Sequence, residues 1–233
     1  MDLAPGRGQA LSGLAGRRSV PKPARPPPIR VGVLAVQGAV SEHLDAIRRA
    51  AARRGWDVEA VAVRTPKDLA GVHGLVLPGG ESTTISRLLR SGHLQDSVVE
   101  RATRGDLALF GTCAGLILLS KSAKHDVESK DIQLLGLLDA EVDRNAFGRQ
   151  KDSFESALEV EGIGKMPAVF IRAPVLTKAW APTEVLAKNE RGIVAVRKGR
   201  ILGTAFHPEL TEDTRLHEWF IEMAEQASRA HAN

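Results

Sequence analysis

Short apolar runs alternate with stretches of helical periodicity in the first half of the chain. Four such runs predict buried strands at residues 30–36, 58–63, 74–77 and 107–110. The segment after the first run predicts a helix up to about Arg54, because Leu44, Ile47 and Ala51 fall on one face. Helices are also expected after the third and fourth runs. This alternation predicts an α/β fold, with a mostly parallel, doubly wound sheet covered by helices on both faces.

Strand-like runs dominate the second half of the chain, from residue 134 to residue 204. A hairpin is expected from residues 192–196 and 200–205, with Lys198 and Gly199 between the two strands. Hairpin strands are antiparallel. The C-terminal half should therefore add some antiparallel strands to the sheet.

A closing helix is predicted from about residue 211 to residue 229. Glu212 and Asp213 suit its positive N-terminal end. Its apolar residues recur at helical spacing, at Leu216, Phe220, Met223 and Ala227.

The first 28 residues differ from the rest of the chain in composition. They are rich in Pro, Gly, Ala and Arg and end in three prolines, a composition that cannot form a core. We therefore expect residues 1–28 to be a disordered tail and residues 29–233 to form one domain of ordinary size. The tail fits an organelle transit peptide, an upstream start codon or a harmless extension.

Charge and composition narrow the class of protein. The chain has 32 basic and 28 acidic residues, and residues 1–28 carry the whole net charge of +4. The remainder is balanced, so it has no net basic field for DNA or RNA. No apolar run approaches the roughly 20 residues that span a bilayer, so no membrane partner is expected. A single cysteine forms no internal disulfide, which favours a cytoplasmic protein.

That cysteine, Cys113, has surroundings typical of a catalytic nucleophile. It lies in Gly111-Thr112-Cys113-Ala114-Gly115, between an apolar strand and a segment that can open a helix. A nucleophile between two glycines at such a turn is the cysteine form of the nucleophile elbow, and the helix N-terminus favours its thiolate. A lone cysteine is also commonly a buried core residue, so this motif alone leaves both interpretations open.

A partner for the thiol lies near the C-terminus, in His207-Pro208-Glu209. The preceding residues predict a strand that carries His207 at its end. His207 can accept the thiol proton, and Glu209 can hold the imidazole in the required tautomer. We expect His-x-Glu to be extended, which places both side chains on the same side of the chain. Cys113, His207 and Glu209 are thus the predicted catalytic triad, and a surface His-Pro turn is the alternative.

A glycine pair follows the third predicted strand, in Pro78-Gly79-Gly80. Backbone N–H groups at such a turn can stabilise the oxyanion of a tetrahedral intermediate. A turn of this kind is also able to cradle a phosphate, but no Gly-Lys-Ser/Thr is present and a P-loop is excluded. All three motifs lie at or just beyond predicted strands, so the C-terminal edge of the sheet should bring them together.

In this order, Leu77-Pro78-Gly79-Gly80, Gly111-Thr112-Cys113-Ala114-Gly115 and His207-Pro208-Glu209 resemble the motifs of a class I, triad-type glutamine amidotransferase. Further segments are similar to one subfamily, the glutaminase subunits of pyridoxal 5'-phosphate synthases. These segments are residues 31–43 (VGVLAVQGAVSEH), 79–84 (GGESTT), 143–150 (DRNAFGRQ) and 170–174 (FIRAP). The resemblance extends from about residue 29 to the last helix and implies a flavodoxin-like arrangement of the sheet.

The resemblance implies that L-glutamine is hydrolysed to L-glutamate and ammonia, and that a pyridoxal 5'-phosphate synthase subunit receives the ammonia. It implies an oxyanion hole formed by the amides of Gly80 and Ala114, with no cofactor and no metal. It assigns glutamine binding to Gly80, Glu81, Ser82, Arg144, Ile171 and Arg172. An arginine can grip the α-carboxylate of glutamine through two hydrogen bonds, although the role of Arg172 can also belong to its backbone. Residues 37–43 and 81–84 are the candidate contact face for the partner.

Two other classes fit parts of the sequence. One is a different cysteine hydrolase on the same elbow, such as a peptidase or a glutaminase that serves another synthase. The other is a non-catalytic binding module, against which the intact Cys113, His207 and Glu209 argue. A dinucleotide-dependent dehydrogenase is excluded, because no Gly-x-Gly-x-x-Gly follows the first strand.

Overall fold

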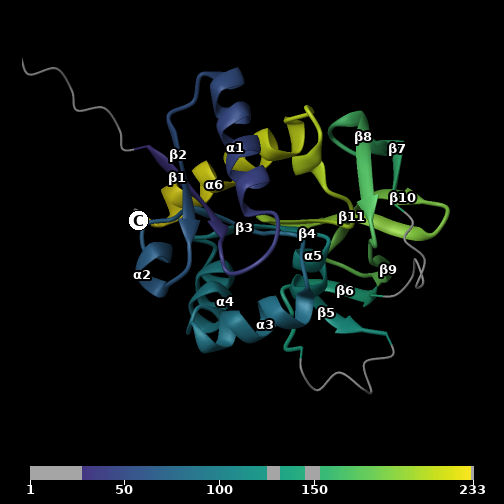
Figure 1. Ribbon diagram of the computed structural model, residues 1–233, viewed down its shortest axis with the longest axis horizontal. Coiled ribbons are helices and arrows are strands. Elements are labelled where there is room, and N and C mark those ends of the chain that lie inside the picture. Colours follow the sequence, from purple (N-terminus) through teal and green to yellow (C-terminus); the bar gives the residue numbers. More distant parts are fainter. Residues whose placement is uncertain (1–27, 125–131, 145–152, 232–233) are drawn as a thin grey trace, which may run out of the picture.

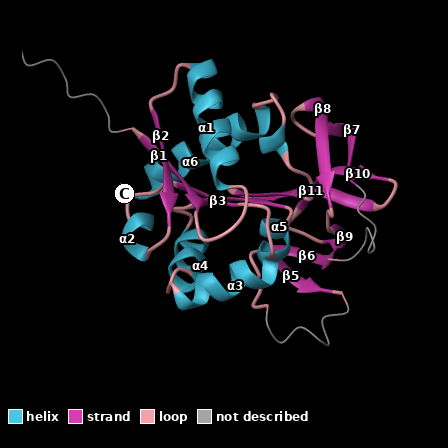
Figure 2. Ribbon diagram, viewed as in Figure 1, coloured by secondary structure: helices cyan, strands magenta, loops and turns pink. Residues whose placement is uncertain are grey.

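A computed structural model describes residues 28–124, 132–144 and 153–231 (Figure 1). A mixed ten-stranded sheet forms the centre of the fold, and Figure 2 shows helices on both of its faces. The predicted α/β class, with antiparallel strands in the C-terminal half, is confirmed. The predicted tail lies almost wholly outside the described residues, so the division into tail and domain stays a prediction.

The large sheet combines a parallel part with an antiparallel part. Its strands are β1 (Ile29–Leu34), β2 (Val58–Val63), β3 (Gly74–Leu77), β4 (Ala108–Thr112), β5 (Ser120–Ala123), β6 (Leu138–Asp143), β9 (Val175–Ala179), β10 (Glu184–Asn189), β11 (Gly192–Lys198) and β12 (Ile201–Thr204). They lie in the order β2-β1-β3-β4-β12-β11-β9-β6-β5, with β10 beside β11. Neighbours from β2 to β12 are parallel, whereas β11 and β12 form the expected antiparallel hairpin. A separate hairpin consists of β7 (Ser153–Val160) and β8 (Gly164–Ile171).

Helices pack on both faces of this sheet. They are α1 (Val40–Arg54), α2 (Pro66–Leu69), α3 (Ser82–Ser91), α4 (Gln95–Arg104), α5 (Ala114–Leu119) and α6 (Arg215–His231). Helices α1 and α6 contact each other on one face, and α3, α4 and α5 lie on the other (Figure 1). None of the described helices is long and apolar enough to cross a membrane.

Helix α1 buries a face that differs in part from the predicted one. Its buried residues are His43, Ala46, Ile47, Ala50 and Ala51. Ile47 and Ala51 were expected there, but Leu44 is only partly buried. A histidine takes the buried position instead, because polar groups of β4 and α6 lie opposite it.

The last helix begins at Arg215, four residues later than the sequence predicts. The residues before it form turns, in which the Thr211 N–H donates to the Pro208 carbonyl at 3.2 Å. Asp213 lies ahead of the helix and accepts a hydrogen bond from the Arg215 N–H at 3.1 Å. The acidic pair therefore marks the approach to the helix rather than its first turn.

The parallel strands form the rigid base of the molecule. Every residue of β3, β4 and β12 is buried, and the buried apolar side chains of both halves form one contiguous cluster. Interiors packed in this way resist displacement. Residues at and just beyond the C-terminal ends of these strands are consequently held in fixed positions.

Candidate active site

A cleft of about 560 Å³ opens at the C-terminal edge of the parallel strands. Its lining comes from the segments that follow β1, β3, β4 and β12, and from the β7–β8 hairpin and the residue that follows it. The lining residues are Gly38, Ala39, Gly79, Gly80, Cys113, Ser153, Ile171, Arg172 and His207. The three sequence motifs therefore meet at one place, as expected for ligand sites of doubly wound sheets.

Cys113 occupies a sharp turn between β4 and α5. Its φ of 48° and ψ of −101° are unusual for a residue other than glycine, and its N–H donates to the Thr204 carbonyl at 2.8 Å. A Cβ at Gly111 would lie 2.6 Å from the backbone carbon of Gly115, and a Cβ at Gly115 would collide with the carbonyl of Leu77. Both flanking glycines are required for close packing, so the elbow predicted from the sequence is present.

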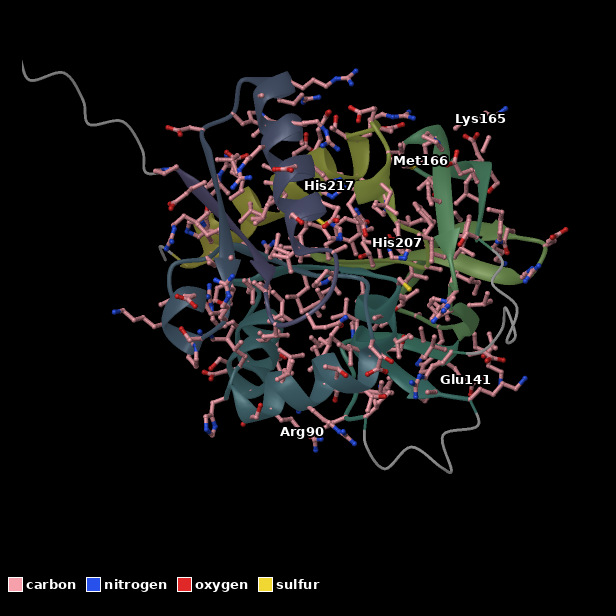
Figure 3. The ribbon with its side chains drawn as sticks, in the orientation of Figure 1. Arg90, Glu141, Lys165, Met166, His207 and His217 are labelled. Carbon is pink, nitrogen blue, oxygen red and sulfur yellow. The ribbon has the colours of Figure 1, made fainter. Side chains whose placement is uncertain are left out.

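His207 follows β12 and faces the cleft. Its N–H donates to the Val169 carbonyl of β8 at 2.8 Å, and its Nδ1 lies 2.7 Å from Glu209 Oε1. Figure 3 marks His207 where the strands end, near the middle of the domain. Because Nδ1 is engaged by the carboxylate, the other ring nitrogen is left for Cys113.

The His-x-Glu segment is not extended, contrary to the prediction. His207 has a φ of −106° and a ψ of 85°, and Pro208–Leu210 form a 3-10 turn. Proline at the first position of that turn needs no N–H partner and fixes φ, which favours the turn. The turn itself, and not the alternation of a strand, brings Glu209 onto His207.

The electrostatics of the pair favour a charged histidine. Burial opposes the charged form of His207, but hydrogen bonds to Cys113 and Glu209 raise its pKa to about 10. Burial likewise opposes ionisation of Glu209, yet His43 and the hydrogen bond from His207 lower the pKa of its carboxyl. His207 is therefore protonated at neutral pH, between a carboxylate and the free Cys113.

Two backbone amides near Cys113 suit an oxyanion hole. The Gly79 N–H donates to Thr112 Oγ1 at 3.0 Å, and the Gly79 carbonyl accepts from the Ala39 N–H at 3.1 Å. On the other side of the same peptide, the Gly80 N–H makes no hydrogen bond within the described part of the chain. Ala114 is the first residue of α5, so its N–H has no partner within the helix.

The other predicted glutamine-binding residues take different positions around this turn. Gly80, Ile171 and Arg172 line the cleft, and the Ile171 carbonyl lies 3.9 Å from Cys113 Sγ. Arg172 has a φ of 45°, so its backbone is also strained. Ser82 and Arg144 lie together beside the cleft, where Arg144 Nη2 donates to Ser82 Oγ at 3.2 Å.

Glu81 acts as the N-cap of α3. Its carboxylate accepts from the Thr83 and Thr84 N–H groups at 3.0 and 2.6 Å, and its own N–H donates to Gln37 Oε1 at 2.9 Å. Burial raises the pKa of Glu81, but the hydrogen bonds from Thr84 and Thr83 outweigh it and lower the pKa to about 2. Glu81 thereby fixes the position of the neighbouring Gly80.

Two residues of the site were not recognised from the sequence, and one of them was assigned to another surface. Thr112 and His43, which lie behind Glu209 and Gly79, were not predicted as site residues. His43 was placed on the contact face of a partner, but it is fully buried and cannot be part of that face. The available signal was a histidine on the apolar side of α1. Within the described residues, no three His, Cys, Asp or Glu side chains are arranged to hold a metal ion.

Comparisons with known proteins agree on one family. Residues 33–226 match the SNO glutamine amidotransferase family. The chain is 51% identical over 197 residues to the pyridoxal 5'-phosphate synthase subunit PdxT of Archaeoglobus fulgidus, which covers 84% of this chain and 99% of that protein. It is 50% identical over 194 residues to the PdxT subunit of Thermus thermophilus, over 83% of this chain and 97% of that protein.

Solved structures give the same picture for the fold. A crystal structure described as a glutamine amidotransferase is similar, with a TM-score of 0.75, 49% identity and coverage of 84% of this chain and 98% of that one. A glutamine amidotransferase from Thermotoga maritima is similar in fold alone, with a TM-score of 0.54 and 15% identity over 86% of this chain and 92% of that one.

Proposed function

This chain belongs to the SNO glutamine amidotransferase family, and we propose that its Cys113 cleft hydrolyses the side-chain amide of L-glutamine. It is a glutaminase subunit that supplies ammonia for the synthesis of pyridoxal 5'-phosphate, the active form of vitamin B6. The observation that carries the assignment of residues is the arrangement of Cys113, His207 and Glu209 at the cleft. The same intact triad argues against a non-catalytic binding module.

The reaction starts with the proton on His207. Cys113 attacks the amide carbon of glutamine as a thiolate, and the amides of Gly80 and Ala114 stabilise the oxyanion that forms. His207 donates its proton to the leaving nitrogen, the carbon–nitrogen bond breaks, and ammonia departs from a glutamyl thioester. His207 then takes a proton from water as the water attacks the thioester; the carbon–sulfur bond breaks, glutamate leaves, and the Cys113 thiolate and the protonated His207 are restored. Glu209 holds the imidazole in place through both halves of the reaction.

Glutamine recognition belongs, in this proposal, to residues on both sides of the nucleophile. Arg144, held by Ser82, offers a guanidinium to the α-carboxylate of glutamine. Ile171 and Arg172 act through their backbone, because the Ile171 carbonyl faces Cys113 while the Ile171 side chain is 37% exposed. Gly80 and Glu81 complete the site by fixing the turn that carries the oxyanion amide.

Free ammonia has to reach a synthase, so we propose a complex with a pyridoxal 5'-phosphate synthase subunit. The exposed residues next to the cleft are the candidate contact face, namely Gly38, Ser41 and Glu42 on one side and Glu81 on the other. These positions flank the cleft mouth, where a docked partner would collect ammonia before it escapes. The free thiol of Cys113 is compatible with a reducing compartment, and we place the protein in the cytoplasm.

The test of this function is the release of ammonia and glutamate from L-glutamine, measured with and without the synthase subunit. We expect the wild type to release one ammonia for each glutamate. Cys113→Ala should release none, although alanine is small enough for the elbow. Peptide hydrolysis in place of glutamine hydrolysis would contradict the proposed substrate. Full activity of Cys113→Ala would contradict the proposed nucleophile.

A further inference from the structure

A second layer of polar side chains lies behind the triad and is not used by the reaction as described above. His43 of α1 places its Nε2 at 3.0 Å from Thr112 Oγ1 and at 3.4 Å from Glu209 Oε2. Its Nδ1 lies 3.1 Å from Nε2 of His217, which belongs to α6. Figure 3 labels His217 where α1 and α6 lie together, and its side chain is fully buried. Three elements thus converge on the buried side of Glu209.

This layer is fully buried and largely uncharged. His43, Thr112 and His217 are each 0% exposed. Burial lowers the pKa of His43. Burial and the neighbouring His43 ring together lower the pKa of His217 to about 3. Both rings are therefore neutral at neutral pH, and each carries a single N–H whose position matters.

The charges that surround the two rings favour one position for those protons. His43 is faced by the carboxylates of Glu209 and Glu42 and by the ring of His207. His217 is faced by Glu209, His43 and the guanidinium of Arg49. The nearest full charge to His43 Nε2 is the Glu209 carboxylate, whose buried Oε2 lies at 3.4 Å and accepts no hydrogen bond within the described residues.

Two proton arrangements are possible for the pair of rings. If His43 carries its proton on Nδ1, its Nε2 lone pair faces the Glu209 carboxylate and His217 is left with a buried N–H that has no acceptor. If His43 carries its proton on Nε2, that N–H points at Glu209 and Thr112, and His217 donates its own Nε2–H to His43 Nδ1. The second arrangement leaves only the lone pair of His217 Nδ1 unpaired, which costs less than an orphaned N–H beside an unpaired carboxylate oxygen.

We propose that His43 is a positioning residue for the glutaminase reaction, which holds Glu209 through its Nε2–H in a tautomer fixed by His217. This inference rests on the proposed triad and deepens it. Oε1 of Glu209 is hydrogen-bonded to His207 and Oε2 faces His43 Nε2 at 3.4 Å, so contacts at both oxygens oppose rotation of the carboxylate away from the imidazole.

Thr112 extends the same layer to the oxyanion turn. Its Oγ1 accepts a hydrogen bond from the Gly79 N–H at 3.0 Å and faces His43 Nε2 at the same distance. One buried histidine therefore contacts both the group that orients the base and the group that orients the Gly79–Gly80 peptide. Loss of His43 should slow the chemical step more than it weakens glutamine binding, because His43, Thr112 and Glu209 do not line the cleft.

The experiment compares variants in the complex with the synthase subunit. His43→Leu removes both ring nitrogens at similar bulk, and His43→Gln returns an N–H donor at the reach of Nε2. His73→Leu is the matched control, because His73 Nδ1 likewise accepts a structural hydrogen bond, from the Arg30 N–H at 3.0 Å, but at the opposite edge of the sheet. We expect His43→Leu to lower kcat roughly ten- to a hundredfold with KM for glutamine nearly unchanged, as for a lost hydrogen bond to a charged group.

Recovery of most of the turnover by His43→Gln, and wild-type kinetics for His73→Leu, would support the assignment. Wild-type kcat for His43→Leu, or a Gln variant no better than the Leu variant, would overturn it. The proton arrangement is tested separately in the unmodified protein by ¹⁵N NMR of its histidine rings, where His43 protonated on Nδ1 would also overturn the inference. If the wild-type complex releases no ammonia from glutamine, the proposed function fails, whereas the NMR result still decides the arrangement of His43 and His217.

Discussion

Gly79 has no room for a side chain beside His207, the proposed general acid and base, so a single methyl group at this position should strongly reduce activity. A Cβ built on Gly79 would fall well inside van der Waals distance of His207 Cε1, at 3.1 Å from His207 Nδ1 and at 3.4 Å from Cys113 Cβ. Carbon atoms in contact prefer separations of about 3.5–4.0 Å, so the ring has to move by roughly 1 Å. The change adds no charge and removes no functional group.

The magnitude follows from the tolerance of the reaction for misplacement. A shift of about 1 Å between reacting groups costs about a hundredfold in rate, which corresponds to about 2.7 kcal/mol of activation free energy. We therefore expect Gly79→Ala to lower kcat for glutamine hydrolysis by about two orders of magnitude. Its melting temperature should change little, because the methyl group points at a cleft and not into the apolar core.

The assay is steady-state ammonia release in the presence of the synthase subunit, together with the rate at which a glutamine-like electrophile labels Cys113. A matched control is Gly92→Ala, because Gly92 ends α3 with a φ of −82° that alanine adopts, and a Cβ there would approach the carbonyl oxygens of Leu88 and Arg64, at 3.0 and 3.8 Å, instead of His207. We expect the control to keep wild-type kinetics. Turnover of Gly79→Ala within twofold of the wild type would refute the placement of His207 against Gly79.

Four further results are expected. Cys113→Ala should keep the melting temperature of the wild type and release no ammonia, and measurable turnover would remove Cys113 from the mechanism. His207→Asn should lose more activity than Glu209→Gln, because the imidazole itself moves the proton, and the reverse order in kcat would contradict these roles. Glu81→Gln should cost about 1 kcal/mol of stability near neutral pH. Since the pKa of Glu81 in the folded protein is about 2 against an ordinary 4.5, the stability difference between wild type and variant in thermal melts should persist above pH 4.5 and vanish as the pH falls toward 2. The synthase subunit should raise turnover at saturating glutamine roughly a hundredfold if docking orders the oxyanion amide of Gly80, and an unchanged kcat would contradict that activation.

The placement of Cys113, His207 and Glu209 at one cleft was predictable because each of the sequence motifs has a local signature. Cys113 stands between two glycines that the turn requires, and the His207–Glu209 pair follows an apolar strand. Because the C-terminal ends of parallel strands lie at one edge of the sheet, these residues are also expected to meet there. Local residue types determine the turns, so the sequence carries this information without a structure.

The second layer was not predictable for a physical reason. His43 lies one turn before Ile47 and so falls on the apolar side of the helix, but the sequence of α1 itself shows no polar group that could pair with it there. Its burial depends on Thr112 and His217, which lie on elements far away in the chain. Only the three-dimensional contact supplies the partners that make a buried histidine favourable. The turn at Pro208 was not predicted either, because an extended segment would also have placed Glu209 on the same side of the chain as His207.

The position of β12 in the sheet determines when the site around Cys113 can form during folding. This strand is the last of the described strands to be synthesised, yet it lies in the middle of the sheet, between β4 and β11. Until it inserts, β4 has an open edge, the Cys113 N–H lacks the Thr204 carbonyl, and His207, which follows β12, is not held at the cleft. A chain that carries Cys113 but ends before β12 is therefore expected to release no ammonia from glutamine. The cost is an exposed strand edge during folding, which makes this stage vulnerable to aggregation.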